Sequence, residues 1–121
     1  MTHSTSSTAF DATALPPVVA RYLAAQDDAG TRPAIIDLFA PDARVVDEGI
    51  ERVGSDAIRD WLATTASAFE YTTTFVDQRN DGGGAWVVRA RLEGNFPGGV
   101  ADLRYSFSVA DDHIVDLMIA P

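Results

Sequence analysis

Apolar residues recur three and four positions apart in the first half of the chain, which is the spacing of one face of a helix. Three helices are expected, at 16–29, at 33–39 and from Ser55 onward. Two prolines open the first segment and Gly30 follows it, as is typical of a helix start and stop. Ser55 is a favourable N-cap because its hydroxyl can accept a hydrogen bond from the first turn. The first half is therefore predicted to be largely helical.

Apolar and polar residues alternate in the second half, and this alternation predicts β-strands. Two short strands at 43–47 and 50–53 are expected to form a hairpin, with Glu48 and Gly49 as its turn. Longer strands are expected at 69–77, 85–94, 102–109 and 114–119. Because the helices come first and the strands follow, the pattern favours an α+β fold, with helices covering one face of a mostly antiparallel sheet.

The alternation also assigns faces to the late strands. Tyr105 shares a face with Leu103, whereas Asp102 and Arg104 point to the other face. The last strand is apolar on both faces apart from Asp116, and a strand of this kind must be covered on both sides. We therefore expect a homodimer formed through the sheet, with an ordinary central strand of a monomer as the alternative.

The length of the chain fits one domain. With 121 residues, 46% of them hydrophobic, a single core can form. Residues 1–12 are rich in serine and threonine and are expected to form a disordered tail, followed by one domain at 13–121. The tail has neither a basic nor a long apolar segment, so it does not resemble a signal peptide, and a cytoplasmic location is expected.

Charge and composition argue against several kinds of partner and chemistry. Eighteen acidic and nine basic residues give a net charge of −9, so neither nucleic acid nor an anionic membrane is expected as a partner. The chain has no cysteine, which excludes disulfides and thiol nucleophiles. His3 and His113 have no neighbour at metal-ligand spacing, so neither a metal nor a cofactor is expected.

Three local motifs occur in a characteristic order, at 38–43 (Leu-Phe-Ala-Pro-Asp-Ala), at 54–58 (Gly-Ser-Asp-Ala-Ile) and at 95–98 (Asn-Phe-Pro-Gly). With these motifs and the order of its elements, the chain resembles the NTF2-like superfamily, in particular its SnoaL-like and ketosteroid-isomerase-like members. The resemblance covers 15–121. It implies a curved antiparallel sheet that forms a cone, covered by three N-terminal helices.

The resemblance also implies a pocket for a hydrophobic small molecule at the open end of the cone. Aromatic and apolar side chains are expected to line it, in addition to two tyrosines considered below. The candidates for ligand contact are Phe39, Trp61, Phe69, Tyr71, Phe96 and Met118. The alternative for each of the aromatic residues is that it fills the core.

Asp47 is the strongest candidate for chemistry. It ends a strand just before a turn, and alternation puts it on the same face as Val45. On the inner face it would enter an apolar cavity, where loss of water makes a carboxylate a competent general base. The resemblance implies the same role, since ketosteroid-isomerase-like members carry their catalytic aspartate here. The alternative is that Asp47 bonds the turn formed by Glu48 and Gly49.

Two tyrosines are candidates to hold a substrate oxygen. Tyr22 falls where the ketosteroid-isomerase-like enzymes carry a first-helix tyrosine that donates a hydrogen bond to the enolate. Tyr105 falls where they carry a protonated aspartate on a late strand. A shift of one residue in that strand would turn Tyr105 out of the pocket. This departure from the pattern favours a related proton transfer next to a carbonyl, or an aldol cyclisation, over steroid isomerisation.

Two functions are therefore expected as alternatives. The first is a lyase, isomerase or cyclase that uses Asp47 as a base and the two tyrosines as donors. The second is a non-catalytic domain that binds a similar ligand, in which Asp47 only closes a turn. Epoxide hydrolysis also occurs on this fold. Asp102, Arg104 and Asp116 supply the residue types for it, but the first two point away from the face of Tyr105.

Overall fold

The computed structural model describes residues 7–28, 30–64, 66 and 68–121. Within these ranges, seven strands form one sheet in the order β1-β4-β5-β6-β7-β2-β3. Neighbouring strands are antiparallel, except that β2 and β7 run parallel. The strands are β1 (Thr8–Ala9), β2 (Phe39–Asp47), β3 (Ile50–Val53), β4 (Tyr71–Asn80), β5 (Ala85–Gly94), β6 (Val100–Ala110) and β7 (His113–Ala120). The helical elements are η1 (Ala12–Ala14), α1 (Pro17–Ala25), η2 (Arg32–Leu38) and α2 (Ser55–Ala63).

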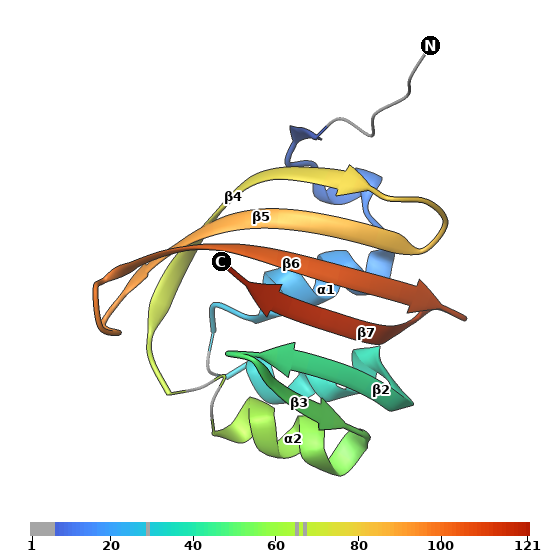
Figure 1. Cartoon of the computed structure of the whole chain (residues 1–121), viewed down its shortest axis with the longest axis horizontal. Helices are drawn as coiled ribbons and strands as arrows, with labels where there is room; N and C mark the ends of the chain where they lie inside the picture. Colours follow the sequence, from blue (N-terminus) through green and yellow to red (C-terminus); the bar gives the residue numbers. More distant parts are fainter. Residues whose placement is uncertain (1–6, 29, 65, 67) are drawn as a thin grey trace.

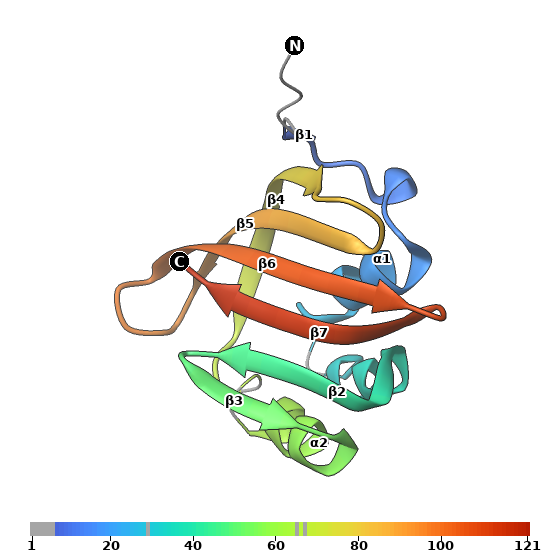
Figure 2. The same cartoon turned by 45° about the vertical axis from the view of Figure 1, so that its right-hand side comes forward.

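The helices lie together on one side of the curved sheet (Figures 1 and 2). Helix α1 crosses behind the long strands, and α2 packs near β2 and β3. Side chains from helices and strands meet in one core, and its largest fully buried members include Trp61, Ile58, Phe107 and Leu117. The α+β fold predicted from the order of the elements is confirmed.

Two of the predicted helices differ from the observed elements. Helix α1 ends at Ala25 instead of near residue 29, because the next two aspartates bond backbone groups outside the helix. Asp27 Oδ2 accepts from the amide of Thr73 at 3.1 Å, and Asp28 Oδ1 accepts from the amide of Gly30 at 2.8 Å. The second predicted helix is the 3-10 helix η2, a segment too short to be stable as an α-helix.

The predicted tail is ordered over part of its length, and its boundary needs correction. Strand β1 pairs with β4, and the ring of Phe10 stacks on Phe75 with 4.6 Å between the ring centroids. The amide of Asp11 donates to Gln78 Oε1 at 2.8 Å, and Gln78 Nε2 donates to the carbonyl of Asp11 at 3.0 Å. These contacts attach 8–12 to the sheet. Residues 1–6 lie outside the described part of the chain.

The register of the sheet places one row of side chains on its inner face. Asp47 on β2 pairs with Ile119 on β7, which pairs with Tyr105 on β6, which pairs with Val88 on β5. Directly paired residues on neighbouring strands share a face. Val88 and Tyr105 are buried in the core, so Asp47 also lies on the core side. The register therefore keeps Tyr105 on the inner face, as predicted.

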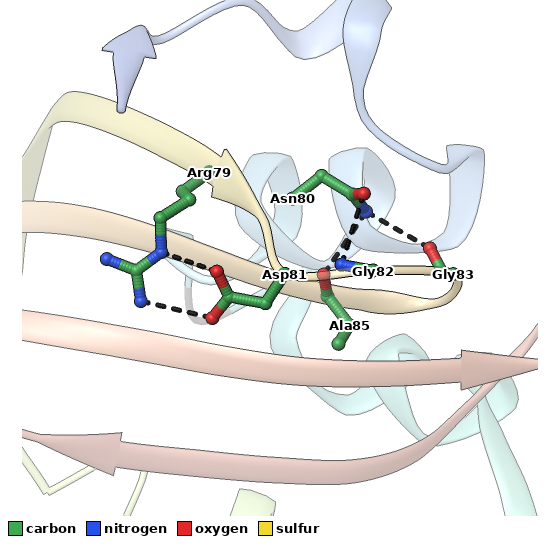
Figure 3. Close-up of polar contacts among 6 residues, drawn as sticks. All are labelled: Arg79, Asn80, Asp81, Gly82, Gly83 and Ala85. Atoms are coloured by element: carbon green, nitrogen blue, oxygen red, sulfur yellow. Dashed lines mark hydrogen bonds and ion pairs between the residues drawn. The ribbon is translucent and has the colours of Figure 1, made fainter. Parts of the chain in front are cut away.

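The hairpin between β4 and β5 is closed by polar contacts (Figure 3). Arg79 binds the carboxylate of Asp81 through two hydrogen bonds of 2.6 and 3.1 Å. Asn80 Nδ2 donates to the carbonyls of Gly83 at 3.0 Å and Ala85 at 3.2 Å. These contacts lie at the opposite end of the sheet from the turn between β2 and β3 (Figure 1). They stabilise the hairpin and do not contribute to the cavity described below.

The ion pair between Asp77 and Arg89 on the outer face gives a pH-dependent prediction. The hydrogen bond from Arg89 holds the pKa of Asp77 below its usual value. A lowered pKa in the folded state stabilises the fold above the pKa of the unfolded chain, near 3.9, and this contribution is lost as the pH falls through the folded value. Asp77→Asn is therefore expected to lower the free energy of unfolding near pH 7 and to have little effect near pH 2, measured by urea denaturation. An equal loss at both pH values would contradict the assignment.

The outer face of the sheet mixes arginines with exposed apolar side chains. Arg91 and Asp102 pair across strands at 3.5 Å, and Val76 and Met118 are exposed. This face is where the homodimer was expected, and the dimer remains a prediction. In the described ranges, no helix is long and apolar enough to cross a membrane.

Candidate functional site

A cavity of about 310 Å³ lies on the inner side of the sheet, and its wall includes Asp47 and Glu48, where β2 turns into β3. Helices α1 and α2, the long strands and the connection between β5 and β6 all contribute to its wall. The lining residues are Tyr22, Gln26, Asp47, Glu48, Trp61, Ala66, Phe69, Tyr71, Leu92, Phe96, Pro97, Ala101, Leu103, Tyr105 and Ile119. The wall is mostly apolar and contains few polar groups, which is typical of small-molecule sites.

Asp47 is held in place by a hydrogen bond from a helix. It is the last residue of β2, and the indole Nε1 of Trp61 donates to its Oδ2 at 3.0 Å. Trp61 is fully buried in α2, so the donor is rigid. The backbone carbonyl of Asp47 accepts from Arg52 at 3.4 Å. These contacts fix the carboxylate at the cavity wall.

Tyr22 and Tyr105 present two buried hydroxyl groups to the same cavity. Their side chains are 3% and 2% exposed, and their ring centroids are 6.3 Å apart. Burial raises the pKa of Tyr22 well above its ordinary value, with Tyr105 and Tyr71 adding to the effect. Burial also raises the pKa of Tyr105. Both groups therefore stay protonated and can donate hydrogen bonds. Within the described residues, the hydroxyl of Tyr22 has no hydrogen-bond partner and is available to a ligand.

Gln26 connects several polar groups of the cavity wall. The residue is 3% exposed, and its Nε2 donates to Thr73 Oγ1 at 3.3 Å. Its backbone carbonyl accepts from Arg32 Nε at 2.5 Å and from the hydroxyl of Tyr71 at 3.3 Å. Gln26 thus orients the hydroxyl of Tyr71, one of the three tyrosines that line the cavity.

Arg32 is a buried cation behind the cavity wall. Its guanidinium lies over the ring of Tyr71, 5.1 Å from the centroid, and Nη1 donates to the carbonyl of Ala66 at 3.3 Å. Burial raises the pKa of Tyr71, and the charge of Arg32 opposes this rise. Arg32 is not among the residues that line the cavity. Its guanidinium contacts backbone carbonyls and the ring of Tyr71 instead.

The structure brings together most of the residues singled out from the sequence. Those that line the cavity are Asp47, Tyr22, Tyr105, Trp61, Phe69, Tyr71 and Phe96. Phe39 is buried behind Tyr22, with the rings in an edge contact at 6.2 Å, and belongs to the core. Met118 does not line the cavity either. It is exposed on the outer face, because β7 alternates and directs its neighbour Ile119 inward.

Some lining residues were not predicted, although signals for them exist in the sequence. Gln26 follows Tyr22 by four positions, which places both on one helix face. Ile119 follows Leu117 by two positions on a strand, so both share the inner face. Glu48 was assigned only to the turn, and this exposed residue also lines the cavity. Sequence spacing alone gives no signal for the contact between Trp61 and Asp47.

The composition of the site limits the chemistry it can perform. Asp47 and Glu48 are the carboxylates of the wall, and no arginine or histidine lines it among the described residues. The chain contains no lysine and no cysteine, so a side-chain Schiff base and a thiol nucleophile are excluded. No group of three metal-binding side chains occurs within the described ranges. Asp102 and Arg104 do not line the cavity, which argues against the arrangement needed for epoxide hydrolysis.

This fold and cavity define a small-molecule pocket protein of the NTF2-like type. Residues 19–117 match the SnoaL-like domain family, and the chain belongs to that family. No match was found among curated proteins.

Solved structures support the same assignment. A candidate polyketide cyclase from Sinorhizobium meliloti is 35% identical, with a TM-score of 0.82 over 92% of this chain and all of the other. A ketosteroid isomerase-like protein from Catenulispora acidiphila, in complex with trimethylamine, is 22% identical, with a TM-score of 0.74 over 88% and 86%. A Mycobacterium tuberculosis protein in complex with estradiol-17beta-hemisuccinate is 15% identical, with a TM-score of 0.69 over 88% and 94%. The last two show likeness of fold alone.

Proposed function

We propose that the chain catalyses proton transfer at a carbon next to a carbonyl group of a small, mostly apolar molecule. The observation that carries this proposal is that Asp47, Tyr22 and Tyr105 line a single, mostly apolar cavity. Isomerisation, cyclisation and elimination next to a carbonyl all begin with this step. The 35% identical protein named as a candidate polyketide cyclase supports the same class of reaction.

In the proposed mechanism, the Asp47 carboxylate removes a proton from the carbon next to the carbonyl. The electron pair of the broken C–H bond moves to form an enolate, and the proton remains on Asp47. Tyr22 donates a hydrogen bond to the enolate oxygen, with Tyr105 as the second donor. Return of the proton to another carbon gives an isomer. Attack of the enolate carbon on a second carbonyl of the same molecule closes a ring, and the alkoxide formed at that carbonyl takes the proton back from Asp47. The net charge within the cavity stays the same when the proton moves, because the enolate replaces the Asp47 carboxylate as the anion.

The hydrogen bond from Trp61 supports the assignment of Asp47 as the base. A base must lie at a fixed distance from the carbon that it deprotonates. Trp61 Nε1 binds only one of the two carboxylate oxygens, Oδ2. In the proposed mechanism the other oxygen, Oδ1, takes up the proton while the buried indole holds the side chain.

The test is hydrogen exchange on neutral ketones with an acidic C–H group. A panel of such ketones, polyketide-like diketones among them, is first screened for binding by quenching of tryptophan fluorescence. Those that bind are incubated in D2O and followed by proton NMR. The proposal predicts deuterium incorporation next to the carbonyl faster than in buffer, with a rate that saturates with ketone. Binding without any acceleration across the panel would identify a non-catalytic binding domain.

A second prediction concerns the indole that holds Asp47. Trp61→Phe removes the hydrogen bond and some core volume, so the free energy of unfolding should fall by about 1–3 kcal/mol. The exchange rate should fall further than ligand affinity, because the base loses its orientation. Trp86→Phe is the matched control, since Trp86 makes no hydrogen bond to Asp47. Equal effects of the two substitutions on the exchange rate would show that Trp61 has only a packing role.

A further inference from the structure

The cavity wall carries negative charge that the proposed proton transfer does not require. One carboxylate is sufficient as the base, and Glu48 adds a second at the rim. The Glu48 side chain has neither a hydrogen bond nor an ion pair within the described residues. Tyr22, whose hydroxyl also has no hydrogen-bond partner there, lines the same cavity. The site therefore has an unpaired anion at its rim in addition to the base and the donors that the proposed proton transfer uses.

Aromatic rings form much of the remaining wall, and they favour cations. Phe69 and Phe96 meet edge to face at 6.1 Å, and Phe69 is 39% exposed. The faces of such rings attract ammonium groups through their negative electrostatic potential. The connection between β5 and β6, which carries Phe96, lies at the same end of the sheet as the β2–β3 turn, which carries Glu48 (Figure 1). A cation at the rim thus has both rings and a carboxylate as partners.

We propose that the cavity selects carbonyl compounds that also carry a positively charged amine, with the ammonium group held at the rim by Glu48 and the rings of Phe69 and Phe96. The carbonyl group then lies deeper, between Asp47 and the two tyrosines. Anionic ligands are selected against, because they place a further negative charge beside Asp47 and Glu48, and no arginine is among the described residues that line the site. The net charge of −9 adds a long-range repulsion of anions.

This inference deepens the proposed function and assumes that the substrate occupies the same cavity. It assigns Glu48 to ligand selection and leaves proton transfer to Asp47. In this arrangement the ammonium group is held by Glu48 and the aromatic rings, and Asp47 remains the base. The two claims can be tested apart, because charge preference is measured by binding and proton transfer by exchange on a neutral ketone.

The experiment compares three ligands with one hydrocarbon body and different charge: 1-adamantylammonium, 1-adamantanol and 1-adamantanecarboxylate. None of them has an acidic C–H group next to a ketone, so binding is measured without turnover. The protein carries Trp86→Phe, which leaves Trp61 in the cavity as the only tryptophan and reporter. We expect the ammonium compound to bind at least about tenfold more tightly than the carboxylate, with the alcohol between them.

Glu48→Gln tests the assigned residue, and Asp112→Asn is the control. The control changes net charge equally but lies in the turn between β6 and β7, at the far end of the sheet, at a positive φ that asparagine tolerates. The preference for ammonium over carboxylate should fall several-fold in Glu48→Gln and stay unchanged in Asp112→Asn. Carboxylate binding as tight as ammonium, or equal effects of the two substitutions, would overturn the proposal. Exchange on neutral ketones would still report on Asp47.

Discussion

Asp47→Asn is expected to lower the rate of deuterium exchange on a bound ketone by roughly 10²- to 10⁴-fold, the usual contribution of a positioned general base. Asparagine has the shape of aspartate and can still accept the hydrogen bond from Trp61, but it cannot take up the substrate proton. Ligand affinity should therefore change little. The measurement is the exchange rate at saturating ketone by proton NMR, with the dissociation constant from Trp61 fluorescence on the same sample.

Glu48→Gln provides the matched control for this substitution. It removes one negative charge from the adjacent residue on the same cavity wall. With a neutral ketone as substrate, the exchange rate should remain close to that of the unmodified protein. If both substitutions reduced the rate equally, the electrostatic potential of the wall would account for the effect, and Asp47 would not be the base.

Tyr22→Phe is expected to produce the second largest loss, roughly 10²-fold in exchange rate, because a donor to the enolate oxygen is removed. Tyr105→Phe should cost less, since Tyr105 is the second donor in the proposed mechanism. Ring volume is retained in both variants, so their thermal unfolding should differ little from that of the unmodified protein. A loss in affinity with no loss in rate would show that the tyrosines bind ligand without stabilising the enolate.

The raised pKa values of these tyrosines add a test by pH. Burial keeps both hydroxyl groups protonated above the ordinary phenol pKa of about 10. The exchange rate should therefore not decline between about pH 8 and pH 10 while the protein stays folded. A decline with a midpoint below about 10 would indicate that a donor ionises in this range, contrary to the burial of Tyr22 and Tyr105.

The strand pattern predicted much of this fold because alternation is a local property. Strands β3 and β5 begin and end at the predicted residues, and Tyr105 lies on its predicted face. Features that depend on distant partners were not predictable in the same way. Helix α1 ends early because the carboxylate of Asp27 accepts a hydrogen bond from the backbone amide of Thr73 in β4. Residues 8–12 contact the sheet because Phe10 stacks on Phe75.

The candidate site shows the same division between local and distant information. The position of Asp47 before a turn made it a candidate, but only the register across β2, β7 and β6 places it in line with Tyr105. Met118 was a candidate by its position in the last strand, but the register pairs Ile119 with Tyr105 and so places Ile119 on the inner face. The indole that fixes Asp47 comes from a helix fourteen positions away, which no strand or helix period indicates.

The most direct test of the central claim is the stereochemistry of exchange at a CH2 group next to the carbonyl of a bound ketone. Because Trp61 holds the Asp47 carboxylate in one position, a fixed base should reach a bound CH2 group from one side only. One hydrogen is therefore expected to be replaced by deuterium well before the other, and Asp47→Asn should remove this selective exchange. Equal exchange of both hydrogens, or selective exchange that survives in Asp47→Asn, would contradict the assignment of Asp47 as the base.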